Sequence, residues 1–422
     1  MRTVLVTGPG GAGRTTVAAA TALAAARAGR RVLLLTGDPG PVPGAVLGTP
    51  LPDGGGDARR PFGPPVEAAP GLWAARIATG EHFTALAGEL QERGAALFDL
   101  LGAAPLDPEE FTELPGAEPL ALLAALRAAH GAGESRDAHG ADGGWELLVV
   151  DMPPGYDTVR LLALPGQLRR YLRRLLPPER QAARALRPVL AQLAGVPMPA
   201  QRLYELAGRW DAELAAVQDV LDAEGTTVHL VAEPGPLTAD ALRTVRAGLA
   251  LHGCRLGALV ANRLLPDGDD PWTAGRAEAQ RTALKGLYEE YGAGGVPVVE
   301  LPHFGRDPLG IDGSPGSGGL DGPAAAVGPV PPPPPAPVPT VEDRLADDNL
   351  LVWRLPLPGA ERDRIGLVRR GDELIVTVGP FRRALPLPSA LRRCTVSGAG
   401  LRDGALCVRF TPDPELWPRT GR

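Results

Sequence analysis

A glycine-rich run near the start of the chain has the residue types and the spacing to bind phosphate. Gly8 to Thr15 reads GPGGAGRT and fits the pattern G-x-x-x-x-G-K-S/T at every position except the lysine. Glycines let successive backbone N–H groups curl around phosphate oxygens, and the N-terminus of the following helix adds partial positive charge. The predicted phosphate-binding residues are Gly8, Gly10, Gly11, Ala12, Gly13, Arg14, Thr15 and Thr16.

The side chains at the end of this run predict a nucleotide site that uses magnesium. The Thr15 hydroxyl would bind Mg²⁺, and Thr16 would lie on the α-phosphate side. Arg14 stands where lysine is usual; it keeps the positive charge, but its longer, forked guanidinium is not a conservative replacement for an ammonium group. The other interpretation is an ordinary glycine-rich turn between a strand and a helix.

Elements of a doubly wound α/β fold are predicted to position this run. A strand over Arg2–Thr7 precedes it, an Ala-rich helix over Thr15–Ala28 follows, and a second apolar strand covers Val32–Thr36. A strand, a helix and a strand in such close succession form a βαβ unit with parallel strands. Continuous apolar strands indicate a sheet that is covered on both faces. Further strands are predicted over Leu147–Val150, Val228–Ala232, Leu256–Ala261 and Val296–Leu301, with a helix over Thr238–Leu251.

With this loop and these strands, the chain resembles the ArsA-type ATPases, the arsenite-pump and tail-anchored-protein-targeting branch of the deviant Walker A NTPases. The family loop reads K-G-G-x-G-K-T-T, whereas Pro9 to Thr16 reads PGGAGRTT, so Pro9 and Arg14 replace both family lysines. The resemblance implies that the first lysine reaches across a dimer to the nucleotide of the partner. Proline has no charged group with which to do this.

Three further blocks resemble the family in the same order along the chain. Asp38, in an Asp-Pro pair after the second strand, matches the switch I aspartate that orients the attacking water; the alternative is a plain strand end. The stretch from Asp151 to Pro165 resembles switch II, and a carboxylate at the end of an apolar strand suits Mg²⁺ held through water. Asn262 matches the asparagine that binds the adenine edge, with a strand-end cap as the alternative.

Composition along the chain predicts three parts. Residues 1–310 would form the ATPase domain, with largely helical inserts at about 79–130 and 157–222. Residues 311–345 are rich in Gly and Pro and predict a semi-rigid linker. Residues 346–412 contain short alternating runs and predict a small all-β sandwich, which resembles the α-crystallin-like domain of some bacterial members. Because its core is small, we expect this module to pack against the larger domain or a partner.

Charge and cysteine usage limit the classes of partner. The formal net charge is −6, so a general nucleic-acid binder is not expected. Three widely spaced cysteines predict buried thiols rather than a disulfide framework, and no apolar stretch is long enough for a membrane span, so we expect a cytoplasmic protein.

The second insert has an arginine run that favours either an anionic-partner surface or a solvated helix face. These residues are Arg160, Arg169, Arg170, Arg173, Arg174, Arg180, Arg184 and Arg187.

The sequence leaves three functions open. The first is a dimeric ATPase that binds ATP and Mg²⁺ and couples nucleotide state to movement of a helical client or partner surface. The second is a weak or inactive nucleotide-binding scaffold that pairs with an active ArsA-type paralogue, which the loss of both lysines favours. The third is a chaperone-like protein that binds a client through its inserts and β module. A homodimer and a heterodimer with such a paralogue are both consistent with the resemblance.

Overall fold

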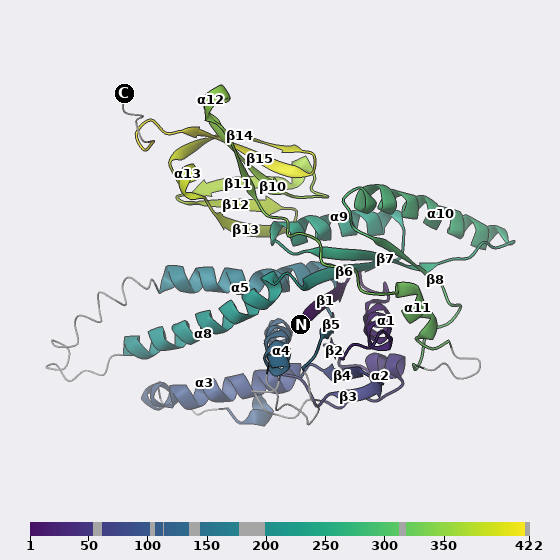
Figure 1. Ribbon diagram of the computed structural model, residues 1–422. Helices are drawn as coiled ribbons and strands as arrows, with labels where there is room; N and C mark the ends of the chain where they lie inside the picture. Colours follow the sequence, from purple (N-terminus) through teal and green to yellow (C-terminus); the bar gives the residue numbers. More distant parts are fainter. Residues whose placement is uncertain are drawn as a thin grey trace.

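An eight-stranded sheet forms the centre of the N-terminal domain (Figure 1). The computed structural model describes residues 1–53, 61–101, 106–112, 114–134, 144–176, 199–311 and 318–417. The strand order is β3-β4-β2-β5-β1-β6-β7-β8, and all neighbours are parallel except β3 and β4. This confirms the predicted doubly wound, mostly parallel class. The strands are β1 (Arg2–Thr7), β2 (Val32–Thr36), β3 (Val66–Ala69), β4 (Leu72–Arg76), β5 (Leu147–Asp151), β6 (Thr226–Ala232), β7 (Leu256–Leu264) and β8 (Val298–Pro302).

Helices cover both faces of this sheet because successive strand side chains point to opposite sides. Val4 and Val6 share one core with α1 (Arg14–Arg27), α2 (Val42–Leu47) and α11 (Asp321–Val327), whereas Leu5 lies in the other core. That second core contains side chains of α4 (Ala117–Glu134), α5 (Gly155–Leu175), α8 (Pro199–Asp222) and α9 (Pro236–Leu251). The remaining helices of this domain are α3 (Thr79–Leu101), α10 (Pro271–Leu287), a 3₁₀ turn at Pro108–Glu110 and a π-helical turn at Tyr288–Gly292.

A hairpin at the edge of the sheet, β3 and β4, was not predicted. Strand β4 pairs in parallel with β2, and β3 turns back along it through Gly71, whose φ of 79° is left-handed. The β4 sequence, LWAAR, is short and rich in alanine, so it lacks the β-branched run that marked the other strands. Because β4 pairs with β2, Arg76 lies at the carboxyl edge of the sheet, opposite Thr36 at the end of β2.

The described arginines of the second insert form ion pairs with carboxylates of this chain. Helices α5 and α8 lie side by side and extend away from the sheet (Figure 1). Arg169 contacts Asp211 of α8 at 3.1 Å, and Arg170 contacts Glu373 of the C-terminal domain at 2.7 Å. Arg160, Arg173 and Arg174 also have acidic partners, namely Asp157, Asp211 and Glu373. Arg180, Arg184 and Arg187 lie outside the described residues.

The C-terminal β domain consists of two antiparallel sheets, with strand orders β14-β15-β10-β9 and β11-β12-β13. Trp353, Val376 and Phe410 are buried in its core. Its strands are β9 (Thr340–Arg344), β10 (Leu350–Pro356), β11 (Ile365–Arg370), β12 (Glu373–Val378), β13 (Phe381–Pro386), β14 (Cys394–Arg402) and β15 (Ala405–Pro412). Two short helices, α12 (Leu345–Asp348) and α13 (Ser389–Arg392), and a 3₁₀ turn at Arg362–Arg364 connect them.

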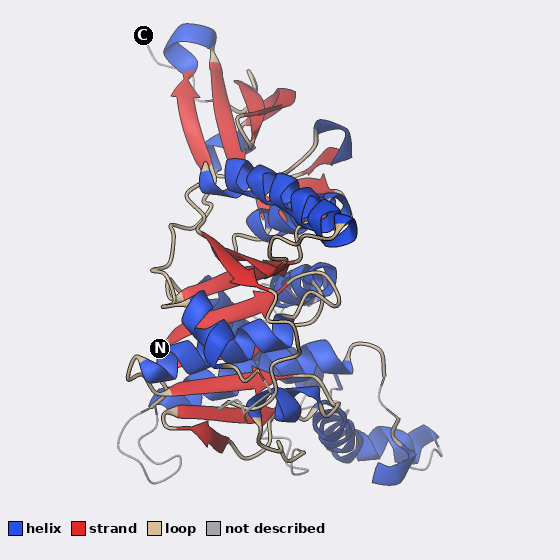
Figure 2. Cartoon of the chain, turned by 90° about the vertical axis from the view of Figure 1, so that its right-hand side faces the viewer, coloured by secondary structure: helices blue, strands red, loops and turns tan. Residues whose placement is uncertain are grey.

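The β domain packs on helices of the N-terminal domain, as its small core predicted. Figure 2 shows helices between the strands of the β domain and those of the large sheet. Phe381 is buried against α9, so closely that a Cβ built on Gly248 would lie 2.5 Å from its ring. The Arg383 guanidinium donates to the Leu251 carbonyl at 2.8 Å. The two domains therefore share one continuous core.

The Gly- and Pro-rich segment predicted as a linker contains two ordered elements. Helix α11 packs along α1, with Leu320 and Ala324 buried, and β9 adds an edge strand to β10. Helix α11 is stabilised by burial of these apolar side chains, whereas β9 is exposed along its whole length and is held by its pairing with β10. None of the helices in the described parts of the chain is long and apolar enough to cross a membrane.

Candidate nucleotide-binding site

The glycine-rich loop connects the end of β1 to the start of α1, which is the position that a phosphate-binding loop needs. Gly13 is the N-cap of α1 with φ of 89°, and a Cβ there would lie 2.4 Å from the Asn262 amide nitrogen. A Cβ on Gly8 would lie 1.9 Å from the Val231 carbonyl oxygen. Both positions therefore require glycine. The N-terminus of α1 carries the positive end of the helix dipole, which stabilises an anion bound beside it.

Thr15 and Asp151 meet on the metal side of the loop. The Thr15 hydroxyl donates to Asp151 Oδ2 at 2.7 Å, and the Thr36 hydroxyl donates to the same oxygen at 3.2 Å. Asp151 ends β5 and is only 8% exposed. Burial raises the pKa of Asp151, although the Thr15 hydrogen bond and the Arg14 charge oppose this effect.

A hydroxyl beside a buried carboxylate suits Mg²⁺, a hard cation that takes oxygen ligands and keeps several waters. Within the described residues, no three His, Cys, Asp or Glu side chains gather so as to hold a metal ion by themselves. The donor set of Thr15 and Asp151 is therefore suited to a magnesium ion that arrives with phosphate oxygens and water as its other ligands.

Asp38 lies in a short turn after β2 and lines a cavity together with Thr15 and Asp151. Its Oδ1 accepts from the Gly40 amide at 2.7 Å. Arg76, whose side chain is 11% exposed, donates to the carbonyls of Asp38 at 2.7 Å and Gly40 at 3.1 Å. A buried guanidinium thus fixes the backbone that carries Asp38. Arg76 was not predicted as a site residue, because nothing near it in the sequence indicates a contact with a residue 38 positions away.

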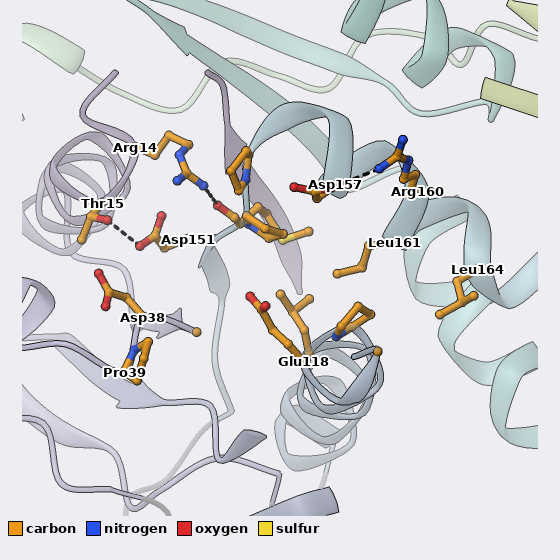
Figure 3. Close-up of a pocket in the computed structure, with 17 residues that line it drawn as sticks. Arg14, Thr15, Asp38, Pro39, Glu118, Asp151, Asp157, Arg160, Leu161 and Leu164 are labelled. Carbon is orange, nitrogen blue, oxygen red and sulfur yellow. Dashed lines mark hydrogen bonds and ion pairs between the residues drawn. The ribbon is translucent and has the colours of Figure 1, made fainter. Parts of the chain in front are cut away.

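Arg14, at the position of the usual lysine, is directed to the switch II segment. Its guanidinium donates to the Met152 carbonyl, one residue after Asp151 (Figure 3). In this arrangement the Arg14 guanidinium lies close to Asp151. The structure thus brings Arg14 together with Thr15 and Asp151, but through a backbone contact that the lysine pattern did not predict.

Asn262 lies under the loop, at the end of β7. It is 7% exposed, its Nδ2 donates to the Ala12 carbonyl at 2.8 Å, and its Oδ1 accepts from the Arg263 amide at 2.9 Å. The Arg263 guanidinium donates to the Gly11 carbonyl at 2.8 Å. The described hydrogen bonds of Asn262 are thus with a carbonyl of the loop and with the amide of the next residue in its own strand.

Several cavities border the loop. One of about 610 Å³ extends from Thr15, Asp38 and Asp151 past Glu118 to Arg160 and Leu164 (Figure 3). Another of about 350 Å³ lies on the side of Thr16 and is bounded by α2, Arg263 and Pro308. A nucleotide with its phosphates on the loop would thus have room for a base on one side and for water and metal on the other.

The three cysteines lie away from the loop, with Cys394 and Cys407 buried and Cys254 half-buried. Burial raises the pKa of the Cys254 thiol to about 12, which disfavours the reactive thiolate.

A parallel sheet with a glycine loop between β1 and α1, and a buried carboxylate at the end of β5, defines a P-loop NTPase-type domain. More specifically, the chain belongs to the ArsA family: the model of the anion-transporting ATPase matches residues 1–313. The model of the HSP20-like domain found in ArsA matches residues 348–410. The predicted family and its C-terminal domain are therefore confirmed.

Relatives match along almost the whole chain. An uncharacterised protein of Streptomyces coelicolor is 55% identical over 99% of this chain and 100% of its own length. A protein of Mycobacterium tuberculosis is 33% identical over 99% of this chain and 97% of its own. A protein of Aquifex aeolicus, provisionally named arsenical pump-driving ATPase 1, is 23% identical over 93% of this chain and 95% of its own.

Proposed function

We propose that this protein binds ATP with Mg²⁺ on the loop from Gly8 to Thr16 and hydrolyses it. The observation that carries the proposal is the buried Asp151 carboxylate, which accepts a hydrogen bond from Thr15 at the mouth of the loop. Burial disfavours the ionised form of Asp151 and raises its pKa, so a divalent cation at this oxygen would stabilise the carboxylate. Membership of an ATPase family supports the same assignment.

Each residue of the site then has a separate task. Backbone amides of the loop and the N-terminus of α1 would bind phosphate oxygens. Thr15 would bind Mg²⁺ directly and Asp151 through water, so that the ion can neutralise charge on the phosphates. Asp38 would orient the attacking water, and its carbonyl contact with Arg76 holds it in position. Asn262 would keep the loop in shape, and base binding would use the remaining amide hydrogen of its side chain.

We further propose that nucleotide state is transmitted through α5. This helix begins at Gly155, directly after the switch II segment, and its ion pairs reach α8 and the β domain. The Tyr156 ring stacks on Phe381 of β13 with centroids 5.9 Å apart. A shift of the segment from Asp151 to Pro154 would therefore move the helical insert and the β domain together. Increased protection of β13 from hydrogen exchange on ATP addition would support this coupling, and unchanged exchange would oppose it.

Phosphate release by the purified chain tests hydrolysis. We expect Mg²⁺-dependent turnover that Asp38→Asn lowers by about 10²-fold or more, the usual scale for loss of a group that assists proton transfer. Arg14→Lys should raise turnover, because the smaller ammonium can reach the phosphates. Asp347→Asn, an exposed carboxylate in the β domain, is the matched control and should leave turnover unchanged. Equal turnover in wild type and Asp38→Asn would contradict the assigned role.

Two residues of the loop favour a second function, that of a nucleotide-binding partner without turnover of its own. The Pro9 side chain carries no charge, and the Arg14 guanidinium is hydrogen-bonded to the Met152 carbonyl. In this case the chain binds ATP without turnover and forms a heterodimer with a paralogue that has both lysines. The test is to assay phosphate release with and without such a paralogue. Turnover only in the mixture favours the heterodimer, whereas equal turnover by the chain alone favours a self-sufficient homodimer.

A further inference from the structure

Arg263 has a backbone conformation that its residue type rarely adopts. Its φ is 58°, and the other non-glycine residues with positive φ in the described ranges are Asn349 and Asp403. Asn and Asp tolerate this left-handed region, whereas a long side chain such as arginine seldom occupies it. Strained residues of this kind persist only where surrounding contacts determine them, and they gather at functional sites.

The conformation of Arg263 arises from an irregularity at the end of β7. The pairing register of β7 with β8 shifts between Ala261 and Leu264. Gln280 of α10, which is 6% exposed, secures the irregularity from behind: its Nε2 donates to the Arg263 carbonyl at 3.1 Å, and its Oε1 accepts from the Leu265 amide at 2.8 Å. A buried side chain thus holds the backbone that follows the strained Cα of Arg263, and on the other side the Arg263 amide donates to Asn262 Oδ1 at 2.9 Å.

The strained residue directs two consecutive side chains onto the phosphate loop. Arg263 donates to the Gly11 carbonyl at 2.8 Å, and Asn262 donates to the next carbonyl, that of Ala12, also at 2.8 Å. Because each peptide unit is planar and trans, fixing a carbonyl also fixes the N–H on its opposite side. Asn262 therefore sets the direction of the Gly13 N–H, and Arg263 sets the direction of the Ala12 N–H.

The Ala12 N–H closes the turn that shapes the loop. It donates to the Pro9 carbonyl at 3.3 Å, and the intervening Gly11 has φ of 76°, which is the pattern of a type II turn. Arg263 thus holds the far side of the same peptide unit that completes this turn. Its guanidinium also lines the cavity beside Thr16, so its positive charge lies close to the site of the phosphates.

We propose that Arg263 is a positioning residue for the phosphate loop: its strained conformation holds the Pro9–Ala12 turn in the shape that binds a nucleotide. This inference rests on the proposed function, since it assigns Arg263 to the same ATP site. The family block that contains Asn262 predicted a contact with the base, whereas the role assigned here is to preorganise the loop before any nucleotide arrives.

Arg263→Gly separates this role from ordinary stability, because glycine relieves the strain while the guanidinium is lost. Asn349→Gly and Asp403→Gly are matched controls, because they place glycine at the other non-glycine positions with positive φ in the described ranges, both in the β domain. We expect the melting temperature of all three variants to be equal to or above that of wild type. In Arg263→Gly alone, the Kd for Mg-ATP should rise about tenfold, the scale for loss of one charge-assisted hydrogen bond.

Amide hydrogen exchange of residues 9–13 in the nucleotide-free protein gives a second readout. Arg263→Gly should exchange faster there than wild type, whereas both control variants should match wild type. If Arg263→Gly retains the wild-type Kd and the wild-type exchange, the positioning role is overturned. If wild type itself does not bind ATP, the proposed function fails, and the exchange comparison still decides whether Arg263 shapes the loop.

Discussion

Replacing Gly248 with alanine should destabilise the protein, although the same change in an exposed helix is stabilising. Gly248 lies in α9, where the β domain rests on the N-terminal domain. A Cβ at this position would lie 2.5 Å and 2.6 Å from the Cδ2 and Cε2 atoms of Phe381, and 3.0 Å from a methyl group of Val159. Phe381 is 3% exposed, so its ring has little room to move away.

Two opposing effects set the magnitude. Alanine improves on glycine in a helix interior by about 1 kcal/mol. Forcing an extra methyl group into a packed core costs about 1–3 kcal/mol. The contacts at 2.5 Å and 2.6 Å are shorter than real Cβ contacts, so the overpacking effect should exceed the propensity effect. We therefore expect Gly248→Ala to lower the free energy of unfolding by about 1–2 kcal/mol.

Urea unfolding followed by circular dichroism measures this change, with Gly275→Ala as the control. Gly275 lies in α10 with no atom within 4 Å of its virtual Cβ, so alanine there should raise stability by about 0.5–1 kcal/mol. Phe381→Leu should partly rescue Gly248→Ala, because the smaller side chain makes room and neighbouring substitutions are not additive. Equal stabilisation by both alanine variants would refute the docking of the β domain on α9.

Three further predictions concern the site and the domain contact. Asp151→Asn should abolish Mg²⁺-dependent ATP binding in calorimetry and should stabilise the nucleotide-free protein. Because burial raises the pKa of Asp151, ionisation of this group opposes folding as pH rises above about 4. The urea midpoint of the variant should therefore exceed that of wild type by a margin that grows with pH. Glu373→Gln should remove the negative charge and one of the two oxygens that accept from Arg170. These hydrogen bonds lower the Glu373 pKa and contribute about 1 kcal/mol or less, because both side chains are about a quarter exposed. The contribution is present above the ordinary pKa of glutamate and is lost as pH falls through the lowered pKa, so thermal melts of variant and wild type should differ at pH 7 and converge in acid. Gly13→Ala should lose ATP binding through its clash with Asn262, and a wild-type Kd in this variant would contradict the loop geometry.

The phosphate side of the site could be predicted because it depends on local pattern and on parallel topology. Apolar runs that end at glycine or aspartate identify strand ends, and parallel neighbours bring these ends to one edge. Thr15 and Asp151 are 136 positions apart, yet each follows directly from such a motif, and the structure joins them by a hydrogen bond. The βαβ unit over the first two strands was predicted with almost the observed bounds for the same reason.

The supporting contacts could not be predicted, since they join elements that no local pattern relates. Arg76 reaches Asp38 only because the unpredicted β4 pairs with β2. Arg263 reaches Gly11 only because an irregular strand end takes a strained conformation. The stacking of Tyr156 on Phe381 depends on how two domains pack. In each case the deciding fact is the relative placement of elements, which residue spacing alone does not contain.

Calorimetric titration of the purified chain with ATP, with and without Mg²⁺, decides whether the loop from Gly8 to Thr16 binds a nucleotide. We expect saturable binding of one nucleotide per chain that requires Mg²⁺ and is lost in Asp151→Asn. An absence of saturable heat at millimolar nucleotide, or an equal Kd with and without Mg²⁺ in both proteins, would contradict it.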